Sequence, residues 1–297
     1  MMMFKKQYSY ILGLGFFLLC GVMPSMSLAQ NAAEEKLAFA KKMDEEVNAV
    51  LHYSVYASGF HVLDIDIAIE NEARSYEVDL NTKLTGILGK LVPWQGAFDT
   101  KGIKKGADHF QPITHKTLAR WKEDEEVRTY KYDQSGRLEK VVVNENGNIH
   151  DAKLLPDLSD GTTDILSLLM EVIADGTCRH EADIFDGKRR FATEFRTLKT
   201  GTVSPSKYNI YEGPAEVCEV EITPKGGKWH KKPRGWLAIQ EQGRAKKKLP
   251  QIFLASIDDK LPAVPVKGVT VSDYGTFLLH LNNVTYGEGR RQLAENE

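Results

Sequence analysis

The chain has 297 residues, of which 27% are charged and 42% are hydrophobic, and its formal net charge is −2 at pH 7. This length suits one large β domain or two smaller domains, and it buries a substantial core without extra cross-links. The near balance of charge argues against a dedicated nucleic-acid-binding protein, so we expect no nucleic-acid partner.

The first 29 residues have the features of a secretory signal peptide. Lys5 and Lys6 form a positive n-region, residues 11–23 are apolar apart from glycines, and residues 27–29 read Ser-Leu-Ala. We therefore expect cleavage after Ala29 and export to the periplasm. A spanning helix needs about 20 apolar residues, so we expect no membrane span in the mature chain. Loss of the two lysines makes the net charge about −4.

Cysteine usage fits an exported protein. Cys20 lies in the signal segment, which leaves Cys178 and Cys218 in the mature chain. In an oxidising compartment such a pair predicts one disulfide, with two free buried thiols or a redox pair as the alternatives. The redox alternative lacks support because the chain has no C-x-x-C motif.

The mature chain begins with a predicted helical lead over residues 30–50, where Leu37, Ala40, Met43 and Val47 follow helical spacing. Residues 51–290 are predicted to form a single β-rich domain, and residues 291–297 a disordered tail. Alternating apolar and polar residues in 64–70 and 76–81 predict a hairpin with one wet face.

Further short strands with turn signals between them predict an all-β, antiparallel class. They are expected at residues 94–100, 116–121, 128–132, 138–143, 180–185, 190–197, 208–211, 217–223, 234–240, 251–257, 265–271 and 276–286.

Two helices are expected to interrupt the strands, one within residues 82–92 and one over 163–174. Asp160 or Thr162 is the expected N-cap of the second helix. This helix is apolar around most of its circumference, so it cannot lie on a surface. We expect it to plug or line the concave face of a strongly curved sheet, in an open barrel or a β-spiral.

Several segments in the same order resemble an exported proteobacterial family, domain-of-unknown-function family 3108. They are residues 53–56 with Gly59, the steps at 110–112 and 261–262, the apolar helix, residues 184–191, and the two cysteines. In this chain Ile165 stands where the family has proline at the helix start. The resemblance implies an exported β-rich fold with a cysteine pair. A related exported family forms a curved β-spiral and supports envelope integrity, which by analogy implies a similar role here.

No catalytic motif is convincing, and we expect no cofactor, no catalytic residues and no metal site. Ser204-Pro205-Ser206-Lys207 and Lys199-Thr200-Gly201 imitate a penicillin-binding pair, but their order and spacing are wrong, so we expect a polar loop. The eight histidines are scattered, with none spaced for a local metal site.

The remaining candidate for binding is the basic stretch 225–248, which also contains tryptophans. Its binding residues are predicted to be Trp229, Lys231, Lys232, Arg234 and Trp236. Such a patch suits anionic lipid or glycan, whereas the alternative is a lysine-rich hairpin that resists aggregation.

These observations predict a non-enzymatic periplasmic protein that supports the cell envelope by binding an envelope component, either anionic lipid or glycan, or an envelope protein. The alternative is a carrier of an apolar, lipid-like ligand in the concave face of the sheet. A hydrolase would require Ser, His and carboxylate groups brought together only by folding.

Overall fold

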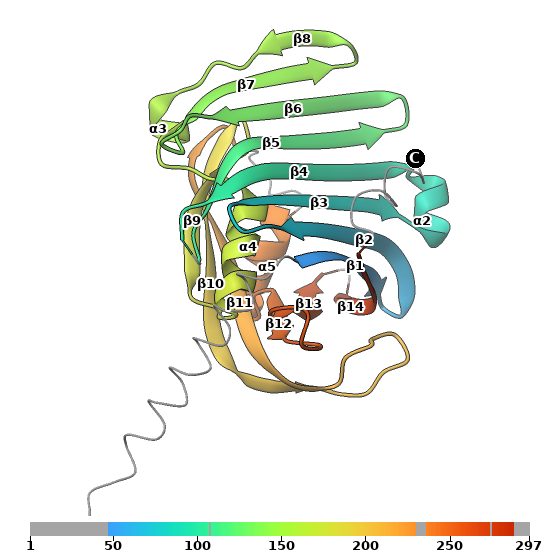
Figure 1. Ribbon diagram of the computed structural model, residues 1–297. Coiled ribbons are helices and arrows are strands. Elements are labelled where there is room, and N and C mark those ends of the chain that lie inside the picture. The colour runs from blue at the N-terminus through green and yellow to red at the C-terminus, as the bar shows by residue number, and fades with distance from the viewer. Residues whose placement is uncertain (1–46, 107, 230–235, 274, 288–297) are drawn as a thin grey trace, which may run out of the picture. The chain divides into compact units, whose positions relative to one another are not determined.

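The computed structural model describes residues 47–287, except residues 107, 230–235 and 274. Within this part, fourteen strands form one antiparallel sheet, in the order β8-β7-β6-β5-β4-β3-β2-β1-β14-β13-β12-β11-β10-β9. Two meanders that follow the chain are joined where the first strand pairs with the last (Figure 1).

The first meander contains β1 (Val47–Ala57), β2 (Phe60–Asn71), β3 (Ser75–Leu84), β4 (Trp94–Lys104), β5 (Phe110–Trp121), β6 (Asp124–Tyr132), β7 (Leu138–Glu145) and β8 (Asn148–Asp151). The second contains β9 (His180–Phe185), β10 (Arg189–Val203), β11 (Gly213–Gly227), β12 (Gln251–Ala255), β13 (Val264–Ser272) and β14 (Gly275–Tyr286). The helices are α2 (Gly86–Leu91), α3 (Pro156–Ser159), α4 (Ile165–Asp175) and α5 (Trp236–Lys246).

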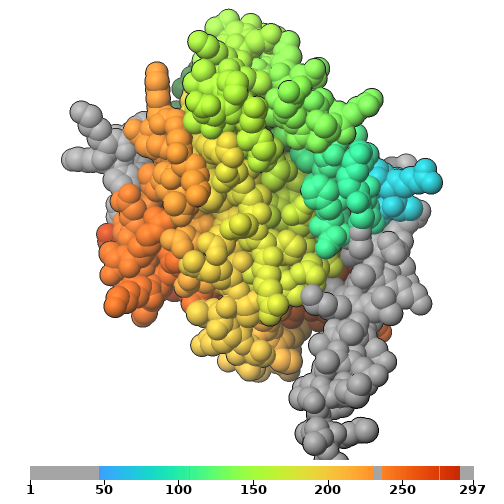
Figure 2. Space-filling view, turned by 90° about the vertical axis from the view of Figure 1, so that its left-hand side faces the viewer, coloured from blue at the N-terminus to red at the C-terminus, as the bar shows by residue number. Residues whose placement is uncertain are grey.

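The sheet curves around α4 but does not close, because β8 and β9 end the order without pairing to each other. Figure 2 shows the β9 and β10 surface in yellow, between the green first meander and the orange α5 region. The expected class, an antiparallel, strongly curved open sheet around one apolar helix, is confirmed.

Helix α4 fills the concave side of the sheet. Leu166, Leu168, Met170 and Ile173 are at most 1% exposed, and the helix contacts β4, β5 and β9. Asp164 caps the helix, since its Oδ1 accepts the N–H groups of Leu166 and Ser167. The cap is therefore neither of the two residues expected from the sequence.

Four sequence expectations about secondary structure are wrong in the described part. Residues 199–201, expected in a polar loop, belong to β10 and pair with β11. Residues 47–50, expected at the end of a helix, belong to β1, while the rest of the expected lead lies outside the described residues. Residues 208–211 form no strand, because Tyr211 N–H turns back to Asn209 Oδ1. Where a strand was expected over 234–240, residues 236–240 belong to α5, whose buried Leu237, Gln240 and Gly243 follow helical spacing, and residues 234–235 lie outside the described residues.

Two further predictions concern residues that the structure does not describe. The signal segment 1–29 and the tail 291–297 lie outside the described residues. No helix within the described part is long and apolar enough to cross a bilayer.

Candidate functional site

Large apolar side chains are exposed together at one end of the sheet. Phe60 is 71%, Ile87 72% and Leu91 71% exposed, and Leu88 and Trp121 are exposed as well. We call these five residues the apolar rim. They come from the start of β2, from α2 and from the end of β5, and α2 lies at this end of β2 to β4 (Figure 1).

Backbone hydrogen bonds bring these separate segments together. Thr85 N–H donates to the carbonyl oxygen of Val62 at 3.0 Å, which holds the start of α2 beside β2. Lys122 N–H donates to the carbonyl oxygen of Pro93 at 3.2 Å, which holds the end of β5 beside the segment that follows α2. These bonds place the segments that carry the rim residues at the same end of the sheet.

Helix α2 is oriented with its small residues toward the protein. A Cβ atom added to Gly89 would lie 2.4 Å from the carbonyl oxygen of Leu84, and one added to Gly86 would lie 2.9 Å from that of His61. Gly86 also has φ +61°, a conformation that favours glycine. The glycines let the helix backbone approach the strands, so Ile87, Leu88 and Leu91 point outward and no residue of α2 is buried.

The basic and aromatic stretch is only partly described. Lys231, Lys232 and Arg234 lie outside the described residues. Trp229 and Trp236 are half-buried, with ring centroids 5.6 Å apart in an edge-to-face arrangement. The guanidinium of Arg189 lies 4.9 Å from the centroid of Trp229. Both tryptophans pack against the core cluster around the disulfide, so much of their surface is already used within the protein.

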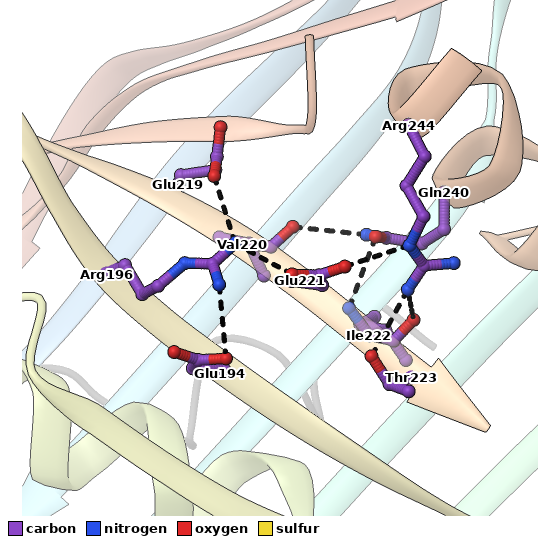
Figure 3. A network of polar contacts seen from close by, with 9 residues as sticks. All are labelled: Glu194, Arg196, Glu219, Val220, Glu221, Ile222, Thr223, Gln240 and Arg244. Carbon is purple, nitrogen blue, oxygen red and sulfur yellow. Dashed lines mark hydrogen bonds and ion pairs between the residues drawn. The ribbon is translucent and has the colours of Figure 1, made fainter. Parts of the chain in front are cut away.

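A polar network fixes α5 next to these tryptophans (Figure 3). Arg244 Nε donates to Glu221 Oε1 at 2.8 Å, and Arg196 donates to the other oxygen of Glu221 at 2.7 Å. Gln240 exchanges two hydrogen bonds with the β11 backbone, at Val220 and Ile222. Two guanidinium groups beside Glu221 lower the pKa of its carboxyl group. The network therefore anchors the helix rather than leaving its charges free for a ligand.

Cys178 and Cys218 form the predicted disulfide, with Cα atoms 5.2 Å apart. Cys178 follows α4 and Cys218 lies in β11, and both are fully buried. The bond thus ties the end of the core helix to the second meander.

One buried cluster brings together Ser, His and carboxylate groups. Ser167 Oγ donates to Asp164 Oδ2, and His115 Nδ1 lies 3.3 Å from Asp164 Oδ1. Thr100 Oγ1 donates to Asp164 Oδ1 at 2.8 Å, and Tyr76 Oη is 2.6 Å from Ser167 Oγ. In a hydrolytic triad the histidine lies between the other two groups, whereas here the aspartate does. All five residues are nearly inaccessible, and burial lowers the pKa of His115, so the cluster serves packing.

On the opposite face of the sheet, Glu77, Asp79 and Asp99 place carboxylate oxygens within 4.8 Å of one another. Lys101 Nζ lies 2.7 Å from Glu77 Oε1. Burial, followed by a hydrogen bond with Asp99 and the charge of Asp99, raises the pKa of Asp79 to about 8. A shared proton and the lysine thus compensate this charge, and we assign no cation to the cluster.

Two clefts in the described part are lined by charged and polar side chains together with apolar ones. The larger has a volume of about 730 Å³ and lies beside α4, lined by Gln111, Thr163, Glu171, Glu181 and Asp183 among others. The smaller, of about 540 Å³, includes Asp64, Asp66, Lys83 and Arg120 on the face away from α4. Such linings do not suit an apolar ligand.

Comparison with known proteins assigns the chain to a family. Residues 52–281 match the family described as "Protein of unknown function (DUF3108)". The chain belongs to the DUF3108 family. The match covers the sheet from β1 into β14, including the core helix, the cysteine pair and the whole apolar rim. The resemblance seen in the sequence is confirmed.

Among solved structures, this DUF3108 chain is similar to a crystal structure of a "Beta-barrel-like Protein of Domain of Unknown Function DUF1849" from Brucella abortus. The two share 13% sequence identity with a TM-score of 0.43, over 82% of this chain and 99% of that one. No curated protein matches the DUF3108 chain.

Sequence reasoning missed the apolar rim. The helical spacing of Ile87, Leu88 and Leu91 was visible, but apolar spacing by itself suggests a buried face. The signal that could have revealed the orientation is the pair Gly86 and Gly89, which lie on the opposite side of the same helix. Phe60 and Trp121 join the rim only through strand pairing that the sequence does not show.

Proposed function

We propose that this DUF3108 protein is exported to the periplasm and works as a non-enzymatic protein of the cell envelope, which docks on an envelope component through the apolar rim. The observation that carries the proposal is the rim itself. Three of its side chains are more than two-thirds exposed, although each would gain about 1.5–3 kcal/mol from full burial. Large apolar side chains left exposed together at one end of a sheet are typical of interaction sites in folded proteins.

The cellular location is supported by the signal-like first 29 residues and by the disulfide, which suits an oxidising compartment. The charged groups of the polar clusters described above pair with one another. This supports a role in binding through apolar surface rather than a role in catalysis. The basic stretch around Trp229 remains a second binding prediction. Alanine substitutions of Lys231, Lys232 and Arg234 are expected to weaken retention on anionic envelope extracts.

An apolar carrier is the second candidate, and one observation favours it. Ile65, Leu80 and Phe98 are only partly buried on the side of the sheet that faces α4. A ligand seated there would be a lipid that copurifies with the protein. Mass spectrometry of an organic extract would detect it, and an extract without lipid would remove this candidate.

The proposed role is tested in a deletion strain challenged with detergents and cell-wall antibiotics. The strain receives the intact chain, the chain without residues 1–29, or a rim variant with Phe60→Gln, Ile87→Gln and Leu91→Gln. A matched control carries Ile149→Gln and Leu198→Gln, which remove exposed apolar side chains elsewhere on the sheet.

The intact chain and the control are expected to restore resistance, while the other two fail at equal protein levels. Resistance restored by the chain without residues 1–29 would overturn export. Resistance restored by the rim variant would overturn docking through the rim.

A further inference from the structure

We infer that the apolar rim docks on the surface of a bilayer that contains anionic lipids. This inference rests on the proposed function, which places the protein in the cell envelope, and it identifies the envelope component as a lipid surface. Phe60, Ile87 and Leu91 are exposed on α2 and at the start of β2 and line neither of the two clefts described above, so they suit insertion among lipid chains more than capture of a small molecule.

The orientation of α2 supports a partner outside the protein. Leu and Ile on a short surface helix are ordinarily buried against the sheet, with polar residues outside. In α2 the backbone of Gly89 occupies the inner position, and the apolar residues face solvent. Helix α2 therefore exposes its apolar side, which a surface helix ordinarily buries against its own protein.

Charge near the rim favours an anionic surface. Lys83 and Lys90 are exposed on either side of the outward apolar residues, and the segment from Thr82 to Trp94 contains no acidic residue. Exposed Lys122 follows Trp121 at the next turn. Apolar residues with flanking lysines are the pattern of interfacial helices on anionic lipids.

The position of Trp121 fits the same partner. Trp121 is 46% exposed and pairs across the sheet with Trp94, which directly follows the α2 segment. Tryptophan side chains favour the headgroup level of bilayers. Glu123 and Asp124, exposed at the tip of the same hairpin, limit the basic surface on this side. The inferred contact is therefore centred on α2 and Phe60, with Trp121 at its border.

The inference is tested with vesicles of phosphatidylglycerol mixed with phosphatidylethanolamine, and with vesicles of phosphatidylcholine alone. The proteins are the intact chain as cells process it, the rim variant, the matched control, and a lysine variant with Lys83→Gln and Lys90→Gln. Intact mass ensures that all four have the same N-terminus. All substituted side chains are exposed, so thermal unfolding should remain unchanged.

Cosedimentation should show that the rim variant binds the anionic vesicles at least about tenfold more weakly than the intact chain and the control. The lysine variant should lose the preference for anionic over phosphatidylcholine vesicles. Anionic vesicles should also shift the tryptophan emission to shorter wavelength, and Trp121→Phe should remove part of that shift.

Equal vesicle binding by the intact chain and the rim variant would overturn the inference, as would no binding by either. A rim-dependent dimer in sedimentation without vesicle binding would overturn it in favour of a second copy. If the intact chain does not bind vesicles and the rim variant still does not restore resistance in cells, the lipid partner is wrong and the envelope role stands. If vesicle binding depends on the rim while the rim variant restores resistance, the envelope role falls and the lipid contact stands.

Discussion

Asp79 and Asp99 lie directly opposite each other in strands β3 and β4, on the face of the sheet away from the core helix. Two carboxylates opposite each other would repel if both were charged. Burial and the neighbouring Asp99 raise the pKa of Asp79 to about 8, which favours the protonated form of Asp79 at neutral pH. This pair makes the stability of the sheet fall as pH rises from the ordinary carboxyl pKa of 3.8 to about 8.

The first prediction concerns this pH dependence. Because the pKa of Asp79 is higher in the folded protein than the ordinary value of 3.8, the folded state binds the additional proton. The stabilisation is complete below that ordinary value and is lost as pH rises to about 8. Asp79→Asn should reduce the fall in unfolding free energy between about pH 5 and about pH 9, measured by urea denaturation. An unchanged fall would contradict this role of Asp79.

The second prediction concerns the cap of the core helix. Asp164→Ala removes the acceptor for two helix N–H groups and one of the two buried partners of each of the Thr100 and Ser167 hydroxyls. The free energy of unfolding should fall by about 2–4 kcal/mol, measured by chemical denaturation. Asp160→Ala is the matched control, since Asp160 is exposed and should change stability by less than about 0.5 kcal/mol. Equal effects would show that Asp164 is not the cap.

The third prediction concerns the disulfide. Cys178 and Cys218 are 40 residues apart, and in the chain-entropy model the bond contributes about 4 kcal/mol. The double variant Cys178→Ala and Cys218→Ala should unfold at lower denaturant concentration by a corresponding amount. Intact mass with and without reduction should show one bond in the native protein. Two thiols that react before reduction would contradict the assignment.

The fourth prediction concerns the glycine that seats α2. Gly89→Ala places a Cβ atom against the carbonyl oxygen of Leu84, so α2 must move away from the strands. Hydrogen exchange should increase in residues 85–92, while exchange in the core helix stays the same. Protection of α2 equal to that of the native protein would show that the close approach of Gly89 is not required.

Much of the sheet was predictable because most strands have one buried and one wet face. The alternation of Ile65, Ile67 and Ile69 with polar residues located β2. Helix α5 was mistaken for a strand because its first residues, Trp236 to Ile239, form an apolar run too short to show helical periodicity. The cap at Asp164 was missed because the helix was expected to begin at residue 163, whereas it begins at Ile165.

The candidate site was less accessible to sequence reasoning. Whether Ile87 and Leu91 face the core or the solvent depends on how closely α2 approaches the strands, and two glycines decide that. The cysteine pairing could be predicted, because only two cysteines follow the signal segment and an oxidising compartment was expected. The pairing of Trp94 with Trp121, which places the end of β5 beside α2, depends on strand register.

The pairing of β1 with β14 has a consequence for how the chain is made. During synthesis from the N-terminus, Val47–Ala57 emerges before the other described strands and Gly275–Tyr286 emerges after them. One long edge of the first meander therefore stays without its native neighbour until the strands between them have been made, and closing so long a loop is slow. An unpaired edge of this kind invites association with other chains. Pairing with β14 removes this edge, so β1 stays open to such association until the last strand is in place.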